Sequence, residues 1–228
     1  MATTMAETVE VGAGARLIGA RMTIVGALGM VIGAVFNLVS GADADVALEN
    51  GDIAGYLAVA ESGRQAALIN LSVWIVAICV LCAGGVLLAS SSRDGVSRTL
   101  SMFAFTTGAG TAVMFFSLWA GVVAVLAPAS AAGEPVEAVA HALLMGAVNA
   151  DWVITVMVLS VGGGFLVLSG RDDWAPTWLV RWAYLAFAAG LLALVVLVTG
   201  PRMLASIDVL IGIGLLIAAG VVATRGRR

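Results

Sequence analysis

Lysine is absent from this sequence, and histidine and cysteine are scarce. All 11 basic residues are arginine, histidine occurs once and cysteine twice in 228 residues. The absence of lysine excludes Schiff-base chemistry, and the single histidine, His141, excludes bis-histidine haem ligation within one chain. The chain also lacks a phosphate loop, a histidine–cysteine metal cluster and a GxSxG elbow. We therefore predict no catalytic centre, cofactor or bound metal.

The two cysteines form a C-x-x-C pattern, Cys79-Val-Leu-Cys82. Redox pairs of this kind need a helix N-terminus or a neighbouring cation that favours the reactive thiolate. Here the thiols lie among valine, leucine, isoleucine and alanine, so we interpret them as core residues. A membrane enzyme that uses Cys79, Cys82 or His141 is the third hypothesis for the function.

Apolar residues make up 61% of the chain and charged residues only 11%, a composition that excludes an ordinary soluble domain. A window of about 19 residues predicts six spans, each near the roughly 20 residues that cross the hydrocarbon core. The spans are 17–40, 66–90, 99–127, 145–169, 180–200 and 203–224. We predict an all-α polytopic membrane helix bundle. Its parts are an N-terminal segment 1–15, one six-helix domain over 16–228, and outer loops 41–65 and 128–144.

The arginines predict the orientation of this bundle. Nine lie on one side of the predicted membrane and two on the other. Because arginine-rich loops stay in the cytoplasm, we predict both termini inside (N-in/C-in) and a multi-pass protein of the bacterial inner membrane. The inner set is Arg16, Arg21, Arg93, Arg98, Arg171, Arg181, Arg225, Arg227 and Arg228, and the outer set is Arg64 and Arg202.

Three tryptophans, Trp174, Trp178 and Trp182, recur every four residues. This spacing predicts one stripe at the start of the fifth helix, where indoles form an interfacial belt. An aromatic site for a cation or a cofactor is the alternative.

Glycine is abundant, with 28 residues, and its spacing predicts close helix contacts. Gly29 and Gly33 form a GxxxG pair, and Gly26 lies on nearly the same face. We predict that this face packs on a neighbouring helix of the chain, or on a second copy of it. Three adjacent glycines at 162–164 cannot all serve one packing face, so they predict a flexible or broken segment in the fourth helix.

A set of polar residues shares one depth, near the predicted outer ends of the helices. In one interpretation they line an outward-facing vestibule for a small molecule, lipid or ion. In another, Asp151 or Asp208 pairs with Arg64 or Arg202 and holds the helix ends together. A proton relay is the third, although nothing ionisable continues the path toward the cytoplasm. The candidate ligand-binding residues are Asp151, Asp208, Arg64, Asn149, Asn70, Arg202 and His141.

Three stretches carry a family likeness: AESGRQAALI before the second span, NADWVITVMVLSVGGGFLVLSG in the fourth, and APTWLVRWAYLAFAAG leading into the fifth. With them the chain resembles a broad set of uncharacterised six-span bacterial integral membrane proteins, a domain-of-unknown-function class. The spacing here is E-S-x-R, one residue shorter than in that class. The resemblance implies a fold and a membrane location but no activity. The matching positions are Glu61, Ser62, Arg64, Pro176 and Leu179.

We predict that the protein binds or transports a small molecule, lipid or ion through the vestibule. The alternative is a non-catalytic structural or accessory subunit in a homo-oligomer or a larger membrane complex. The lipid bilayer is the expected surrounding, and no nucleic-acid partner is expected.

Overall fold

The computed structural model describes residues 2–199 and 205–225, and the side chains of residues 13–198 and 205–225. Within these ranges the chain is helical and contains no strand. Six helices are long and apolar enough to cross a membrane, which confirms the predicted all-α fold with six spans. The spans are Ala13–Ser40, Arg64–Ser90, Gly95–Ala131, Glu137–Ser169, Thr177–Val198 and Ser206–Arg225.

Four of the spans are single α-helices, and the other two contain a π-helical segment. The single helices are α1 (Ala2–Ser40), α4 (Arg64–Ser90), α9 (Thr177–Thr199) and α10 (Ser206–Arg225). The third span consists of α5 (Gly95–Gly121), η1 (Val122–Leu126) and α6 (Ala127–Ala131). The fourth consists of α7 (Glu137–Thr155), η2 (Val156–Gly162) and α8 (Gly163–Ser169).

The predicted outer loop 128–144 is mostly helical. Helix α6 runs to Ala131 and α7 begins at Glu137, so little irregular chain separates the third and fourth spans. A hydropathy window ends a span where polar residues begin, but the backbone hydrogen bonds of a helix continue into water. The fourth helix therefore begins before the predicted residue 145, and Asp151 lies well inside it.

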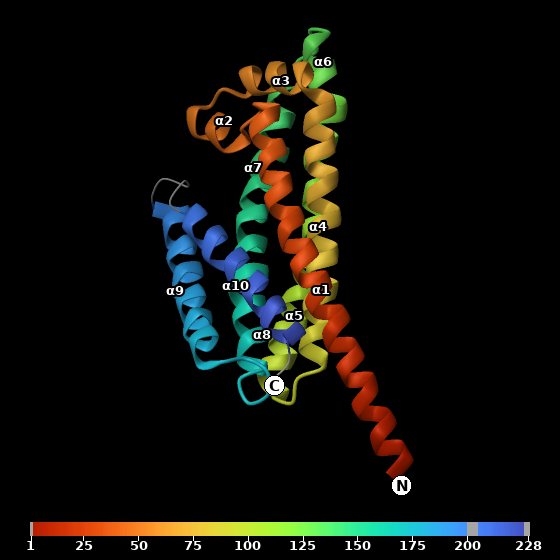
Figure 1. Cartoon of the computed structure of the whole chain (residues 1–228). Coiled ribbons are helices and arrows are strands. Elements are labelled where there is room, and N and C mark those ends of the chain that lie inside the picture. Colours follow the sequence, from red (N-terminus) through yellow and green to blue (C-terminus); the bar gives the residue numbers. More distant parts are fainter. Residues whose placement is uncertain (1, 200–204, 226–228) are drawn as a thin grey trace. The chain divides into compact units, whose positions relative to one another are not determined.

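The predicted loop 41–65 folds into two short helices, α2 (Ala44–Asn50) and α3 (Ile53–Ser62). Its acidic residues cap them: the Asp43 carboxylate accepts a hydrogen bond from the Val46 N–H at 3.1 Å, and Asp52 accepts one from Gly55 at 2.9 Å. Aspartate at an N-cap satisfies amide groups that have no partner within the helix. Helix α3 packs against α6 and η1 (Figure 1).

The described chain groups into two compact units. The first unit comprises Met1–Leu28, Cys79–Ala109 and Thr155–Arg228, and the second comprises Gly29–Ile78 and Gly110–Ile154. In the first unit, α9 and α10 form a hairpin that packs on α8 and η2 (Figure 1). The second unit contains α2, α3, η1 and α6 together with α7 up to Ile154.

Glycine allows α1 and α4 to approach closely in each unit. In the first unit, a Cβ built on Gly26 would lie 2.5 Å from the Cα of Leu81. In the second unit, a Cβ on Gly29 would lie 2.8 Å from that of Ala77, and Gly33 lies against the ring of Trp74. The glycine face of α1 therefore packs on α4 of the same chain.

Candidate functional site

Asp208 is the one carboxylate that is buried among the described side chains, with 2% of its surface exposed. It is the third residue of α10, and the hydroxyl of Ser160 on η2 donates a hydrogen bond to its Oδ1. Its Oδ2 has no hydrogen-bond partner, and no ion pair among the described residues includes Asp208. A buried carboxylate in a membrane helix is costly unless a proton or a cation neutralises it.

Two glycines bring α9 and α10 against the π-helical segment that carries Ser160. A Cβ on Gly190 would lie 2.7 Å from the Cβ of Ser160, and a Cβ on Gly212 would lie 2.5 Å from that of Leu159. Carbon atoms in ordinary contact are about 3.5–4.0 Å apart, so a larger residue at either position would push a helix away. The glycines thus set the spacing of the helices around Asp208 and Ser160.

Each of the glycines at 162–164 faces a different helix of the first unit. A Cβ on Gly162 would lie 3.2 Å from the ring of Phe105, one on Gly163 3.2 Å from Leu216, and one on Gly164 2.6 Å from Phe187. The hydroxyl of Ser101 donates a hydrogen bond to the carbonyl of Gly162 at 3.0 Å. The helix continues through these glycines: Gly162 ends the π-helical segment η2, and Gly163 and Gly164 begin the α-helix α8. The predicted flexible or broken segment stays a prediction. Short π-helical turns are frequent at functional sites.

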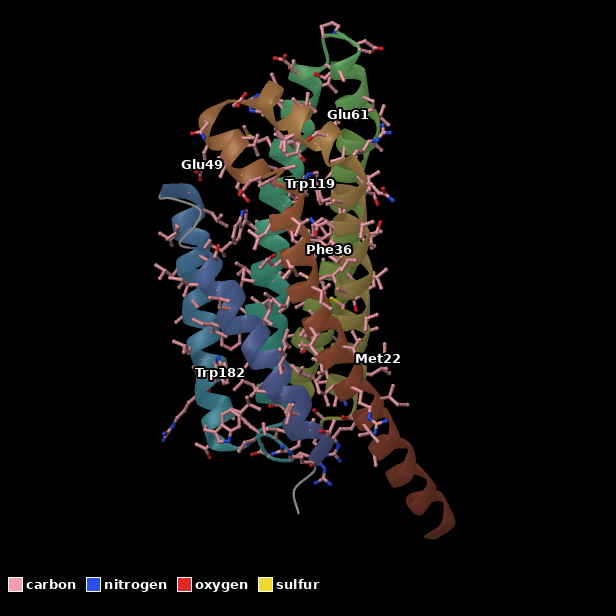
Figure 2. The ribbon with its side chains drawn as sticks, turned by 45° about the horizontal axis from the view of Figure 1, so that its top comes forward. Met22, Phe36, Glu49, Glu61, Trp119 and Trp182 are labelled. Carbon is pink, nitrogen blue, oxygen red and sulfur yellow. The ribbon has the colours of Figure 1, made fainter. Side chains whose placement is uncertain are left out.

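A second polar cluster lies in the second unit. The Asn70 side-chain N–H donates to Asn37 Oδ1 at 3.2 Å, and the Trp119 indole donates to the Tyr56 phenol at 2.7 Å. These residues line a small cavity of about 10 Å³ together with Ser40. Asn70 is 3% exposed, and its Oδ1 has no hydrogen-bond partner among the described residues. Trp119 lies among the helices beneath α3 (Figure 2).

Burial raises the pKa of Tyr56, which lies outside the spans, from its ordinary value of 10.0 to about 12. The unfolded chain releases this proton near pH 10 while the folded chain keeps it. The contribution of Tyr56 to the free energy of unfolding therefore falls between about pH 10 and 12, by about 3 kcal/mol at about 1.4 kcal/mol per pH unit. Lysine side chains usually release protons in the same pH range. The chain contains no lysine, so lysine does not contribute to the loss of stability.

We expect Tyr56→Phe to flatten this alkaline loss of stability and Tyr184→Phe, at an exposed tyrosine of α9, to leave it in place. Thermal unfolding in detergent from pH 9 to pH 12 measures the effect, and tyrosinate absorbance reports the ionisation of Tyr56. If the stability of the two variants fell equally with rising pH, the assignment of this loss to Tyr56 would be contradicted.

The predicted vestibule residues belong to two different compact units. Asp208 belongs to the first unit, and Arg202 lies outside the described residues. In the second unit Arg64 is exposed and forms its ion pair with Glu61, at 3.6 Å, and not with Asp151 as one interpretation had it. That pair is local, because the two residues are three positions apart at the junction of α3 and α4. The remaining predicted residues of the second unit are Asn70, His141, Asn149 and Asp151.

Those remaining residues occupy different environments. Asn70 is buried in the cluster with Asn37, and Asp151 is half-buried on α7. His141 and Asn149 are exposed on the same helix. Trp152, next to Asp151, donates its indole N–H to the carboxylate of Asp45 at 3.1 Å.

Sequence reasoning missed the partners of these groups. Ser160, which binds Asp208, is a lone hydroxyl in an apolar run, and serines are common in membrane helices. Tyr56 and Trp119 are far apart in sequence, and only the packing of α3 brings them together. A lone polar residue in an otherwise apolar span was the only available signal for Ser160.

The predicted tryptophan stripe is wrong for Trp174. This residue is 2% exposed in the turn before α9, and its indole N–H donates to the Ser92 hydroxyl at 3.4 Å. The helix begins after Pro176, because proline disfavours helical geometry in the residue before it. Trp178 and Trp182 do share a face of α9, with ring centroids 6.3 Å apart.

The cysteines are free thiols; Cys82 is buried and Cys79 is half-buried. Within the described ranges, no group of three or more histidine, cysteine, aspartate or glutamate side chains is arranged to hold a metal ion.

Fold and site together define a multi-span α-helical membrane protein with a buried carboxylate beside a π-helical turn. Comparisons with protein-family models, curated proteins and solved structures gave no match. The functional argument therefore depends on the chemistry of the site.

Proposed function

We propose that this chain is an integral membrane protein that binds a small monovalent cation, either a proton or an alkali ion, at Asp208 as the binding step of transport. The observation that carries the proposal is the buried Asp208 carboxylate. One of its oxygens is held by Ser160, and the other has no partner among the described residues.

The chemistry of the site favours a single positive charge. One carboxylate neutralises one charge, and no second buried carboxylate occurs among the described side chains of the first unit. Asp208 lies in the first turn of α10, where unpaired backbone N–H groups favour the ionised carboxylate. An ionised carboxylate oxygen and a hydroxyl oxygen are the hard ligands that alkali and other oxygen-seeking cations prefer.

The position of Asp208 near one end of its span supports exchange with water. It follows Ser206, the first residue of α10, by two residues, or about 3 Å along the helix axis. We further propose the N-in/C-in orientation in a bacterial inner membrane, which the arginine distribution supports. In that orientation the Asp208 end of α10 faces the outer side.

Flux measurements on proteoliposomes test this function. We expect vesicles with the wild-type protein to show proton, Na⁺ or K⁺ flux, measured with entrapped ion-sensitive dyes. Asp208→Asn, which keeps the shape and removes the charge, should reduce that flux to the level of empty vesicles. Ser160→Ala should weaken the apparent affinity for the ion.

Asp172→Asn is the matched control, because Asp172 is an exposed aspartate in the turn before α9. It should leave the flux unchanged. Flux in Asp208→Asn equal to that of the control, or no flux of any of the three ions through the wild-type protein, would overturn the proposal.

A further inference from the structure

An open groove lies on the first unit, away from Asp208, where α4 ends and α5 begins. Its volume is about 550 Å³, within the roughly 300–1,000 Å³ typical of ligand sites. Ser90 of α4 lines it together with the first turns of α5. Because these two helices are spans that end here, the groove lies at one membrane interface. The α5 residues that line it are Arg98, Thr99, Met102, Phe103 and Thr106.

The lining residues form a stripe along α5 that changes from charged to apolar. Arg98, Met102 and Thr106 are spaced four residues apart and so share one face of the helix. The distance from Arg98 to Thr106 is about 12 Å along the axis, from the interface toward the hydrocarbon. Phe103 is 62% exposed on this stripe. A cation at the interface with an open apolar surface beneath it matches the layout of a phospholipid.

The guanidinium of Arg98 is available to bind an anion. No ion pair among the described residues includes it, and its one hydrogen bond goes to the Ser92 carbonyl at 3.5 Å. The carboxylate nearest in sequence, Asp94, pairs with Arg171 at 3.7 Å and accepts a hydrogen bond from the Ser97 N–H at 3.1 Å. The remaining guanidinium N–H groups of Arg98 can therefore donate to a phosphate.

The hydroxyls in the groove already donate to the backbone. Ser90 donates to the Leu87 carbonyl at 2.7 Å, and Thr99 donates to the Gly95 carbonyl at 2.7 Å. Arg98 is thus the principal donor for an anionic group, while Met102 and Phe103 provide apolar contact. Basic pockets at the ends of membrane helices are known to recognise anionic lipid headgroups.

We infer that this groove binds an anionic phospholipid, with the phosphate on Arg98 and an acyl chain along Met102 and Phe103. The site is separate from the proposed cation site, so either can fail without the other.

Native mass spectrometry of the detergent-purified protein tests the inference. The probes are phosphatidylglycerol, phosphatidylcholine of the same chain length, and inorganic phosphate. We expect the wild-type protein to retain phosphatidylglycerol in preference to phosphatidylcholine. Arg98→Gln should weaken phosphatidylglycerol binding about tenfold, because a charge-assisted phosphate contact is lost.

Arg93→Gln is the matched control, because Arg93 is exposed close by and does not line the groove. It should retain the lipid preference. Phe103→Ala, at a position that is 62% exposed, should weaken phosphatidylglycerol binding severalfold and supplies a second test if Arg98→Gln misfolds. Equal lipid retention by the Arg98 and Arg93 variants, full retention by Phe103→Ala, or displacement of the lipid by millimolar phosphate would overturn the inference.

Discussion

Replacing Gly26 with leucine is expected to prevent the protein from forming a stable folded state. A Cβ at this position would lie 2.5 Å from the Cα of Leu81, and the conflict is with backbone that cannot rotate aside. Overpacking by side chains alone costs about 1–3 kcal/mol, so leucine against a backbone should cost more than about 3 kcal/mol. Size-exclusion chromatography and thermal unfolding in detergent measure the loss.

Gly110→Leu is the control, with the same chemical change on another membrane helix. A Cβ on Gly110 has no neighbour within 4 Å, and the residue is exposed. Its stability should change by less than about 0.5 kcal/mol, as is usual for surface substitutions. If Gly26→Leu were as stable as Gly110→Leu, the close packing of α1 on α4 in the first unit would be wrong.

Trp174→Ala should lower the free energy of unfolding by about 3–5 kcal/mol, as is typical when a buried aromatic side chain is deleted. Trp174 is 2% exposed and packs against Gly170, and its indole N–H binds the Ser92 hydroxyl. Thermal unfolding in detergent measures the change.

The matched variant is Trp178→Ala, at the second residue of α9, where the side chain is 51% exposed. Trp178→Ala should lower the free energy of unfolding by less than about 1 kcal/mol, because about half of the side chain already faces the surroundings of the protein. Two equally destabilised variants would show that the three tryptophans form one stripe after all and that Trp174 is not in the core.

Hydropathy predicts the spans well because the bilayer imposes a single requirement on each: about 20 apolar residues with every backbone group satisfied internally. Hydropathy does not predict the start of α7, because this helix begins at a polar residue, Glu137. Hydropathy also does not predict the π-helical form of residues 156–162. The adjacent glycines at 162–164 predict irregularity, but only Gly162 belongs to the π-helical segment, and Gly163 and Gly164 are α-helical.

The site is less predictable than the fold. Asp208 stands out in the sequence as a lone carboxylate in an apolar span, but its partner Ser160 is 48 positions away. The pairing depends on glycines at 190 and 212 that admit close helix contact. Arg64 shows the opposite case, because a partner three residues away, Glu61, was available locally and forms the ion pair.

Infrared difference spectroscopy of the protein in lipid tests the proposed role of Asp208 most directly. Exchange of Na⁺ or K⁺ for a bulky organic cation, or a pH step, should change a carboxylate stretching band in the wild-type protein and in Asp172→Asn. The same band should be missing from the difference spectra of Asp208→Asn. Identical difference spectra for wild type and Asp208→Asn under all three exchanges would show that Asp208 binds no cation.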